Sequence, residues 1–192
     1  MNRTQSIFRR GLLHLATVVG LSLAALLFAA KPMLAANPGQ EQVSRDFQQT
    51  VALGAGQSVR IEHKFGSVRL HGESGRDVKI SATIRAQASS REEAESFAQK
   101  IKIEVQQTSE GVRIKTIYPE DEKRWFHSSK NSSWSVSYDI GMPSEAPITV
   151  RNSFGGVEVT GVHGLADIEN GYGTLIVRDA GTGRWTNAFG SI

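Results

Sequence analysis

Groups capable of acid–base or metal chemistry are few in this sequence and are spread along it. His163 and Asp167 lie four residues apart in a repeated segment, a spacing that can bring an imidazole and a carboxylate together. No pattern of the HExxH type, which places two histidines on one helix face around zinc, accompanies them. We therefore expect no metal site and no cofactor.

The acidic residues do not form an obvious catalytic pair. A glycan-cleaving enzyme needs two carboxyl groups that flank the bond to be broken. Gly181-Thr-Gly183 is too short for a phosphate-binding loop and lacks the lysine that would follow. The sequence thus predicts no catalytic residue, and a polysaccharide-active enzyme is the weakest of the functions considered. The scattered carboxylates are Asp139, Glu158, Asp167, Glu169 and Asp179.

Two large aromatic residues, Trp125 and Phe126, stand in a charged and serine-rich segment, residues 120–133. This composition is typical of a long surface loop. Large aromatics in a polar loop can anchor a protein, glycan or membrane partner, and they can also pack back on a sheet. We name this pair as a possible partner-binding loop.

The charge of the chain excludes a nucleic-acid partner once the N-terminal segment is considered separately. Four of the 22 basic residues lie in the first 36 positions, which hold no acidic residue, so the rest has 18 basic and 19 acidic residues and a net charge of −1. Binding to phosphates requires a basic excess that exchanges with counterions. That excess is missing from residues 37–192.

Residues 1–36 have the order of a secretory signal. Three arginines in the first ten residues precede a 20-residue apolar run, residues 11–30, and small residues follow at Ala35 and Ala36. An apolar run of about 20 residues can also span a bilayer, so an uncleaved signal anchor is the alternative. Pro32 and the paired alanines favour cleavage. Both readings predict an extracytoplasmic domain, whether periplasmic, on the cell surface or secreted.

The domain after this segment is predicted to be mainly β. Residues 37–42 form a polar linker, and residues 43–147 contain alternating apolar and polar stretches typical of half-buried strands. One helix is expected at residues 90–101. Ser90 and Glu93 form a capping box there. The apolar stripe of this helix is Ala94, Phe97, Ala98 and Ile101.

Residues 148–192 repeat the pattern Asn-x-aromatic-Gly-x-aliphatic at spacings of 18 and then 17 residues, and Lys64–Val68 is a partial upstream copy. A constant short period with glycines at fixed offsets predicts stacked coils, here a short β-solenoid of about two strands per coil. The aromatics should stack in a ladder, as core or as a ligand-binding stripe, and we favour core. The repeat positions are Asn152, Phe154, Gly155, Asn170, Tyr172, Gly173, Asn187, Phe189 and Gly190.

These features together resemble a bacterial family named putative adhesin, a domain of unknown function in the toast-rack-like and head-domain β-solenoid superfamily. The resemblance rests on IEHKFGSVRL (61–70), the capped helix, SVSYDIGMP (135–143) and the repeats. It implies an extracytoplasmic β-solenoid without established enzymatic activity. Such domains continue for more coils, whereas this chain stops at Ile192 just as a third copy begins. The alternatives are a short product, an end covered by a partner or by self-association with a second copy, or a truncated relative.

The function expected from the sequence is that of an exported, non-enzymatic, adhesin-like protein that binds a protein or glycan of the cell envelope. The alternative is an envelope-stress sensing or scaffolding module that acts through self-association. A membrane contact is expected only if residues 11–30 are not cleaved.

Overall fold

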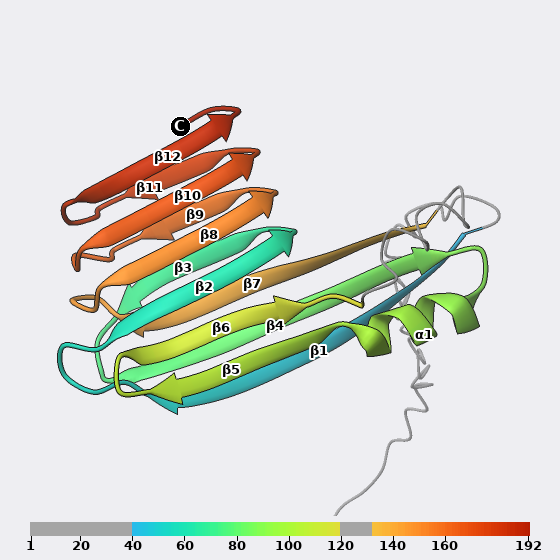
Figure 1. The fold of residues 1–192 in the computed structure, drawn as a ribbon, viewed down its shortest axis with the longest axis horizontal. Coiled ribbons are helices and arrows are strands. Elements are labelled where there is room, and N and C mark those ends of the chain that lie inside the picture. The colour runs from blue at the N-terminus through green and yellow to red at the C-terminus, as the bar shows by residue number, and fades with distance from the viewer. Residues whose placement is uncertain (1–39, 120–131) are drawn as a thin grey trace, which may run out of the picture. The chain divides into compact units, whose positions relative to one another are not determined.

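The computed structural model describes residues 40–119 and 132–192, which form two facing β-sheets and one helix (Figure 1). The expected export segment and the Trp125–Phe126 pair lie outside these described residues. Sheet A contains, in spatial order, β1 (Glu41–Ala52), β4 (Asp77–Ala88), β7 (Ser133–Pro143), β3 (Val68–Glu73), β9 (Val157–Thr160) and β11 (Leu175–Arg178). Sheet B contains β12 (Gly183–Phe189), β10 (Ala166–Tyr172), β8 (Ile148–Phe154), β2 (Ser58–Phe65), β6 (Gly111–Ile117) and β5 (Lys102–Thr108).

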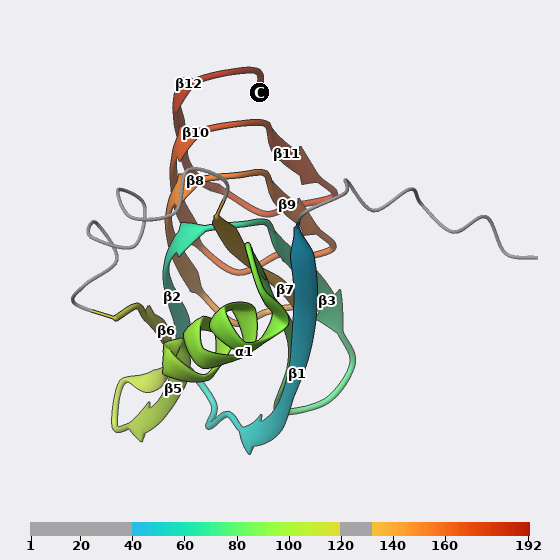
Figure 2. The same ribbon diagram turned by 90° about the vertical axis from the view of Figure 1, so that its right-hand side faces the viewer.

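Both sheets mix parallel and antiparallel pairing. In sheet A, β1, β4 and β7 pair antiparallel, whereas β7, β3, β9 and β11 pair parallel. In sheet B, β12, β10, β8, β2 and β6 are parallel, and β5 closes the edge as the antiparallel half of a hairpin. Each repeat sends one strand to sheet B and the next to sheet A, so successive repeats come to lie parallel (Figure 2).

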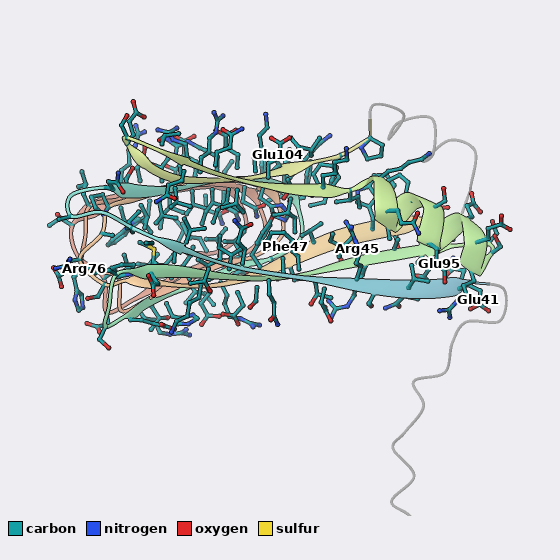
Figure 3. All side chains as sticks on the ribbon, turned by 90° about the horizontal axis from the view of Figure 1, so that it is seen from below. Glu41, Arg45, Phe47, Arg76, Glu95 and Glu104 are labelled. Carbon is teal, nitrogen blue, oxygen red and sulfur yellow. The ribbon has the colours of Figure 1, made fainter. Side chains whose placement is uncertain are left out.

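The strands form where the sequence alternates, because one face of each is buried between the sheets. In β4 the apolar positions Val78, Ile80, Ala82 and Ile84 are all buried. In β7 the buried positions are Trp134, Val136, Tyr138 and Ile140. Figure 3 shows the two sheets edge on, with side chains filling the layer between them. The predicted mainly β fold is confirmed.

Helix α1 (Arg91–Lys100) covers the inner face of β1 and β4 where sheet B does not reach (Figure 3). Ser90 is its N-cap, and the Ser90 hydroxyl accepts a hydrogen bond of 3.2 Å from the Glu93 amide. The predicted apolar stripe is buried from Ala94 to Ile101. The helix therefore begins at the predicted cap and closes the core at this end.

A tight turn of the same shape carries the chain from sheet B to sheet A in each repeat. Gly155 adopts φ 127°, and a Cβ atom on it would lie 2.0 Å from the carbonyl oxygen of Gly66 in the neighbouring turn. The amide of Gly155 donates to the carbonyl of Tyr172, 2.8 Å away. Only glycine can adopt this backbone conformation so close to the neighbouring turn.

Two boundaries differ from those expected. Strand β1 already begins at Glu41, inside the stretch expected to be a linker, because Glu41 and Gln42 pair with Ala88 and Gln87. The stacked layers do not start at residue 148. Strand β2 pairs in register with β8, so residues 58–73 provide the layer before the first full repeat. The described residues all belong to one folded unit, within which no helix has the length and hydropathy to cross a bilayer.

Candidate functional site

Four aromatic rings form a continuous stack where the strands of sheet B end. Phe65, Phe154, Tyr172 and Phe189 hold the same register position on β2, β8, β10 and β12. Successive ring centroids are 5.4, 5.0 and 4.7 Å apart, and the planes differ by 13°, 6° and 6°. The stack includes a ring from the upstream partial copy and thus spans four strands.

We expected these rings to belong to the core, but three of them face solvent. Phe154 is 43% exposed, Tyr172 48% and Phe189 61%. Each ring directly precedes a turn glycine, where the chain leaves sheet B, so it lies at the rim of the layer between the sheets. Neighbouring rings cover one another's faces. The surface offered to solvent is therefore a stripe of ring edges.

The stack is anchored at one end in a buried aromatic cluster. Phe65 packs edge to face on Tyr118, with centroids 5.4 Å apart, and on Trp134 at 5.9 Å. Trp134 in turn contacts Phe97 of α1 at 4.5 Å. The exposed stripe is thereby fixed to the helix-covered part of the core, which gives it a rigid position.

A ladder of asparagines runs behind the ring stack inside the fold. The Asn152 side-chain amide donates to Asn170 Oδ1 at 2.9 Å, and that of Asn170 donates to Asn187 Oδ1 at 3.0 Å. Asn152 and Asn170 are buried. Each buried amide thus finds a partner one strand away, which fixes the register of the stack.

His63 occupies the ladder position on β2, in register with Asn152. Its Nδ1 lies 3.0 Å from Thr116 Oγ1, and the Thr116 hydroxyl lies 2.7 Å from the Tyr138 hydroxyl. Burial lowers the pKa of His63 to about 4 and raises the pKa of Tyr138 to about 12. Both groups are therefore neutral at physiological pH. His63 Nε2 and Asn152 Oδ1 are buried without a hydrogen-bond partner.

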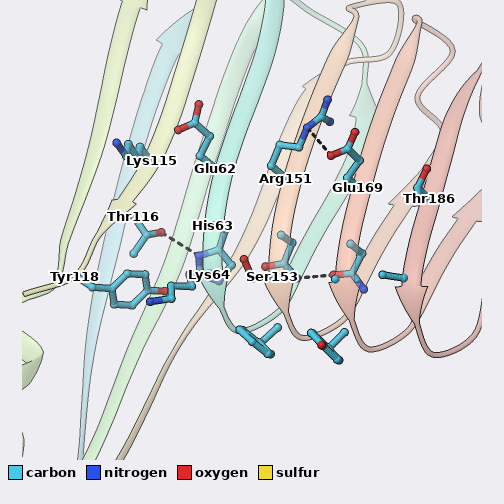
Figure 4. Close-up of a pocket in the computed structure, with 16 residues that line it drawn as sticks. Glu62, His63, Lys64, Lys115, Thr116, Tyr118, Arg151, Ser153, Glu169 and Thr186 are labelled. Carbon is cyan, nitrogen blue, oxygen red and sulfur yellow. Dashed lines mark hydrogen bonds and ion pairs between the residues drawn. The ribbon is translucent and has the colours of Figure 1, made fainter. Parts of the chain in front are cut away.

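A groove of about 820 Å³ lies beside the ring stack and crosses the strands of sheet B (Figure 4). Its floor is formed by Ser153 and Ala188, which have short side chains, and by Gly171, which has none. Tyr118, Phe154 and Tyr172 line one side, and Lys64 lies between Tyr118 and the floor. The other side is a row of outward-facing residues in register: Lys115, Glu62, Arg151, Glu169 and Thr186.

Arginines neutralise the carboxylates of this row. Arg113 Nη2 donates to both oxygens of Glu62, at 2.7 and 2.9 Å, and this hydrogen bond is the main cause that lowers the pKa of Glu62. Arg151 lies 3.2 Å from Glu169, and Arg184 lies 3.3 Å from the same carboxylate. Both carboxylates of this row are therefore paired with arginine side chains.

The structure separates His163 from Asp167 and places each candidate carboxylate beside a basic group. His163 lies between Glu145 and Asp179, 3.4 Å from each carboxylate, while Asp167 bonds Arg151 at 2.6 Å. The hydrogen bond from Arg151 lowers the pKa of Asp167.

The other candidate carboxylates also face basic groups on the outer face of sheet A. Glu158 pairs with Arg178 at 2.7 Å, and Asp139 lies 3.3 Å from His71. Across residues 40–119 and 132–192, no three histidines or carboxylates are placed to hold a metal ion.

Sequence reasoning missed the groove itself and its residues Lys64, Lys115, Tyr118 and Ser153. Lys64 and Ser153 occupy the variable position before the aromatic residue of the motif, and they point outward because they alternate with the ladder residues. Lys115 and Tyr118 come from the β5–β6 hairpin, outside the repeats. Only the pairing of β6 with β2 places them at the groove.

Comparisons with known proteins find only distant structural likeness. No family model matches the chain, and no curated protein matches it. The family resemblance drawn from the sequence therefore stays a prediction.

Among solved structures, a putative cell adhesion protein from Clostridium sporogenes matches 78% of this chain and all of its own length, with 10% identity and a TM-score of 0.39. A putative lipid binding protein from Parabacteroides distasonis matches 75% of this chain and 62% of its own, with 12% identity and a TM-score of 0.31. A putative adhesin from Bacteroides fragilis matches 77% and 97%, with 10% identity and a TM-score of 0.29. Likeness at this level does not identify the function of this chain.

Proposed function

We propose that this chain is an exported, non-enzymatic, adhesin-like protein whose short β-solenoid binds an extended ligand of the cell envelope in the groove beside the ring stack. One observation carries the proposal. A stripe of exposed ring edges on β8, β10 and β12 runs next to an open groove that crosses the paired strands of sheet B. Exposed aromatics beside a concave surface with a few polar groups are typical of binding sites.

The frame behind the groove suits binding because it is rigid. Stacked rings, the asparagine ladder and backbone hydrogen bonds between neighbouring turns hold every strand in register. A preformed site loses little conformational entropy when the ligand binds. The groove also crosses the strands, so a long ligand contacts several repeats at once.

The groove offers binding contacts rather than a catalytic pair. Its carboxylates, Glu62 and Glu169, are each paired with arginine, and the hydrogen bond from Arg113 lowers the pKa of Glu62, which leaves that carboxyl poorly suited to donate a proton. His63 and Tyr138, whose pKa values are strongly shifted, are buried. Shifted groups that are open to substrate would instead be expected of an active site.

The extracytoplasmic location in this proposal rests on residues 1–36, with their arginines, apolar run and paired alanines. It is tested by producing the full chain in bacteria and separating cytoplasm from envelope and medium. A chain that stays in the cytoplasm at full length would contradict export.

Filling the groove tests its role without changing charge. Ser153→Trp places an indole on the floor, whereas Thr149→Trp places the same side chain on the same face of β8 but outside the groove. Both full-length variants are applied to an array of acidic and neutral polysaccharides and extended peptides. We expect S153W to lose binding and T149W to keep it. Equal binding by both variants, or no binding by the parent chain, overturns the proposal, and release of cleaved glycan products overturns its non-enzymatic part.

A further inference from the structure

The charged side of the groove begins with residues of opposite charge placed side by side on β6 and β2. Arg113 Nη2 donates to both oxygens of Glu62, at 2.7 and 2.9 Å. Lys115 lies in register between Glu62 on one neighbouring strand and Glu104 on the other. In this half of the groove each positive group therefore has a carboxylate on an adjacent strand.

The same arrangement continues on β8, β10 and β12. Arg151 lies 2.6 Å from Asp167 and 3.2 Å from Glu169, and Arg184 lies 3.3 Å from each of these carboxylates. Along the row in Figure 4, the sign of the charge thus alternates from strand to strand. An acidic ligand group placed there approaches a carboxylate as well as a guanidinium, and a basic group meets the same conflict.

The other side and the floor of the groove carry rings and hydroxyl groups. Tyr172 and Thr186 are exposed and Ser153 is half-buried, so solvent reaches all three of these side chains. The edges of Phe154 and Tyr172 face the same space. Ring edges are partly positive and suit oxygen-rich ligands. The Lys64 ammonium lies over the ring of Phe65, 4.8 Å from its centroid, at the anchored start of the stack.

A row of alternating donors and acceptors matches a ligand with many hydroxyl groups. A hydroxyl both donates and accepts, so neighbouring hydroxyls can bond a carboxylate on one strand and a guanidinium on the next. A paired carboxylate keeps this capacity, because it has about four lone-pair sites and Glu62 uses two of them for Arg113. Hydrogen bonds of this kind need no net charge on the ligand.

The sheet surface favours a glycan over an extended peptide. The groove lies on the face of sheet B, where strands β6, β2, β8, β10 and β12 already pair with one another. A peptide would find no free strand edge to extend there, and its own amides would lack backbone partners. Sugar hydroxyls need only side-chain partners, which Ser153, Glu169 and Thr186 provide.

We propose that the groove binds an uncharged glycan strand that lies across β2, β8, β10 and β12. Its hydroxyls bond the alternating carboxylates and guanidinium groups of one side and the hydroxyls of Ser153, Tyr172 and Thr186, while its ring oxygens meet the aromatic edges. This inference rests on the proposed function, because it assigns a ligand class to the same groove.

Matched probes test the charge and the class of the ligand. Binding of the full chain is measured by calorimetry with cellohexaose, xylohexaose, mannohexaose and laminarihexaose, which are uncharged, and with hexagalacturonate and an uncharged glycine–serine peptide of similar length. We expect at least one uncharged hexasaccharide to bind about ten-fold or more tightly than hexagalacturonate or the peptide, a difference of about 1.4 kcal/mol. Added salt should leave its affinity unchanged, because the ligand has no charge to be screened.

Matched variants assign the binding to the hydroxyls of the groove. Y172F/T186V removes two of them and keeps the aromatic ring in the stack. It should lower the affinity for the uncharged hexasaccharide at least about five-fold, which corresponds to about 1 kcal/mol. T149V/T160V removes two hydroxyls from strand positions outside the groove and should leave the affinity unchanged.

The possible failures separate the ligand class from the site. Equal losses in the two double variants, binding that falls with salt, or hexagalacturonate that binds as tightly as the uncharged probes overturns the uncharged class. A peptide that binds more tightly overturns the glycan class. If S153W still abolishes binding of the tightest probe in these cases, the groove stands as the site. Absence of any S153W-sensitive binding overturns this inference and the proposed function together.

Discussion

The ring of Phe154 lies 5.0 Å from that of Tyr172 with their planes only 6° apart, although close to half of each side chain is exposed. An exposed aromatic pair is usually free to choose other rotamers. Here the two residues hold the same register position on β8 and β10, and each has a second ring on its other side. The stack therefore holds neighbouring strands together and presents a fixed stripe of aromatic rings to solvent at the same time.

Tyr172→Ala removes the third of the four rings and leaves a gap in the stack between Phe154 and Phe189. We expect a loss of about 1–3 kcal/mol in the free energy of unfolding, because two aromatic contacts disappear and each is worth about 0.5–1.5 kcal/mol. Tyr172→Phe keeps both contacts and should be nearly neutral. Urea unfolding followed by fluorescence measures both variants, and an unchanged midpoint for Y172A would show that the stack adds no stability.

Asn170→Ala breaks the asparagine ladder at its most buried position. It removes the acceptor of the Asn152 amide and the donor to Asn187, and it leaves polar groups unpaired inside the fold. We expect a cost of about 2–4 kcal/mol, since each unsatisfied buried group costs about 1–3 kcal/mol. Asn187→Ala, at a partly exposed position, should cost less. The two variants are compared by denaturant unfolding at one pH, and a larger loss for N187A would contradict this ladder.

Much of the frame follows from local patterns in the sequence. Alternation locates β4 and β7, the Ser90 cap locates the start of α1, and the repeat spacing places Phe154 beside Tyr172. Each of these signals is set by residues close together in the chain, where periodicity and capping act directly.

The features that sequence reasoning missed depend on contacts between distant segments. Strict alternation puts Phe154 on the buried side with Asn152, but the strand ends at that residue and the ring emerges at the rim. The groove needs Lys115 from β6 beside Glu62 from β2, a pairing between strands about 50 residues apart. Neither the residue at which a strand ends nor a parallel pairing between distant strands can be recognised from neighbouring residues in the sequence.

His63 should make stability depend on pH in the acid range. The pKa of His63 is about 4 in the folded chain, below its ordinary value of 6.5, so between these values the unfolded chain binds a proton that the folded chain does not. The contribution of His63 to the free energy of unfolding is fully present above pH 6.5 and is lost as the pH falls toward 4. Below pH 4 this contribution changes no further. The shift corresponds to about 3 kcal/mol.

His63→Asn is the control for this pH effect. Asparagine is the residue at the same register position in the three repeats, and it does not titrate in this range. The difference in unfolding free energy between the parent chain and H63N should change by about 3 kcal/mol between pH 7 and pH 4, in favour of H63N at the lower pH. Thermal unfolding at several pH values measures it, and parallel pH profiles for the two chains would refute the assignment.

Gly155→Ala tests the turn that links the sheets. The residue has φ 127°, and an added Cβ would lie 2.0 Å from the carbonyl oxygen of Gly66, so backbone in two turns must move apart. We expect a loss of more than about 3 kcal/mol, because a strained backbone conformation and a steric clash add together. The adjacent Gly156 has ordinary φ, and its added Cβ would meet only the Thr174 carbonyl oxygen at 3.6 Å, so Gly156→Ala should change stability by less than about 1 kcal/mol. The soluble yield and melting temperature of the two variants are compared. Both carry the same Gly→Ala change, so a difference between them reports on the turn geometry alone. Equal behaviour of G155A and G156A would mean that the turns do not stack as described.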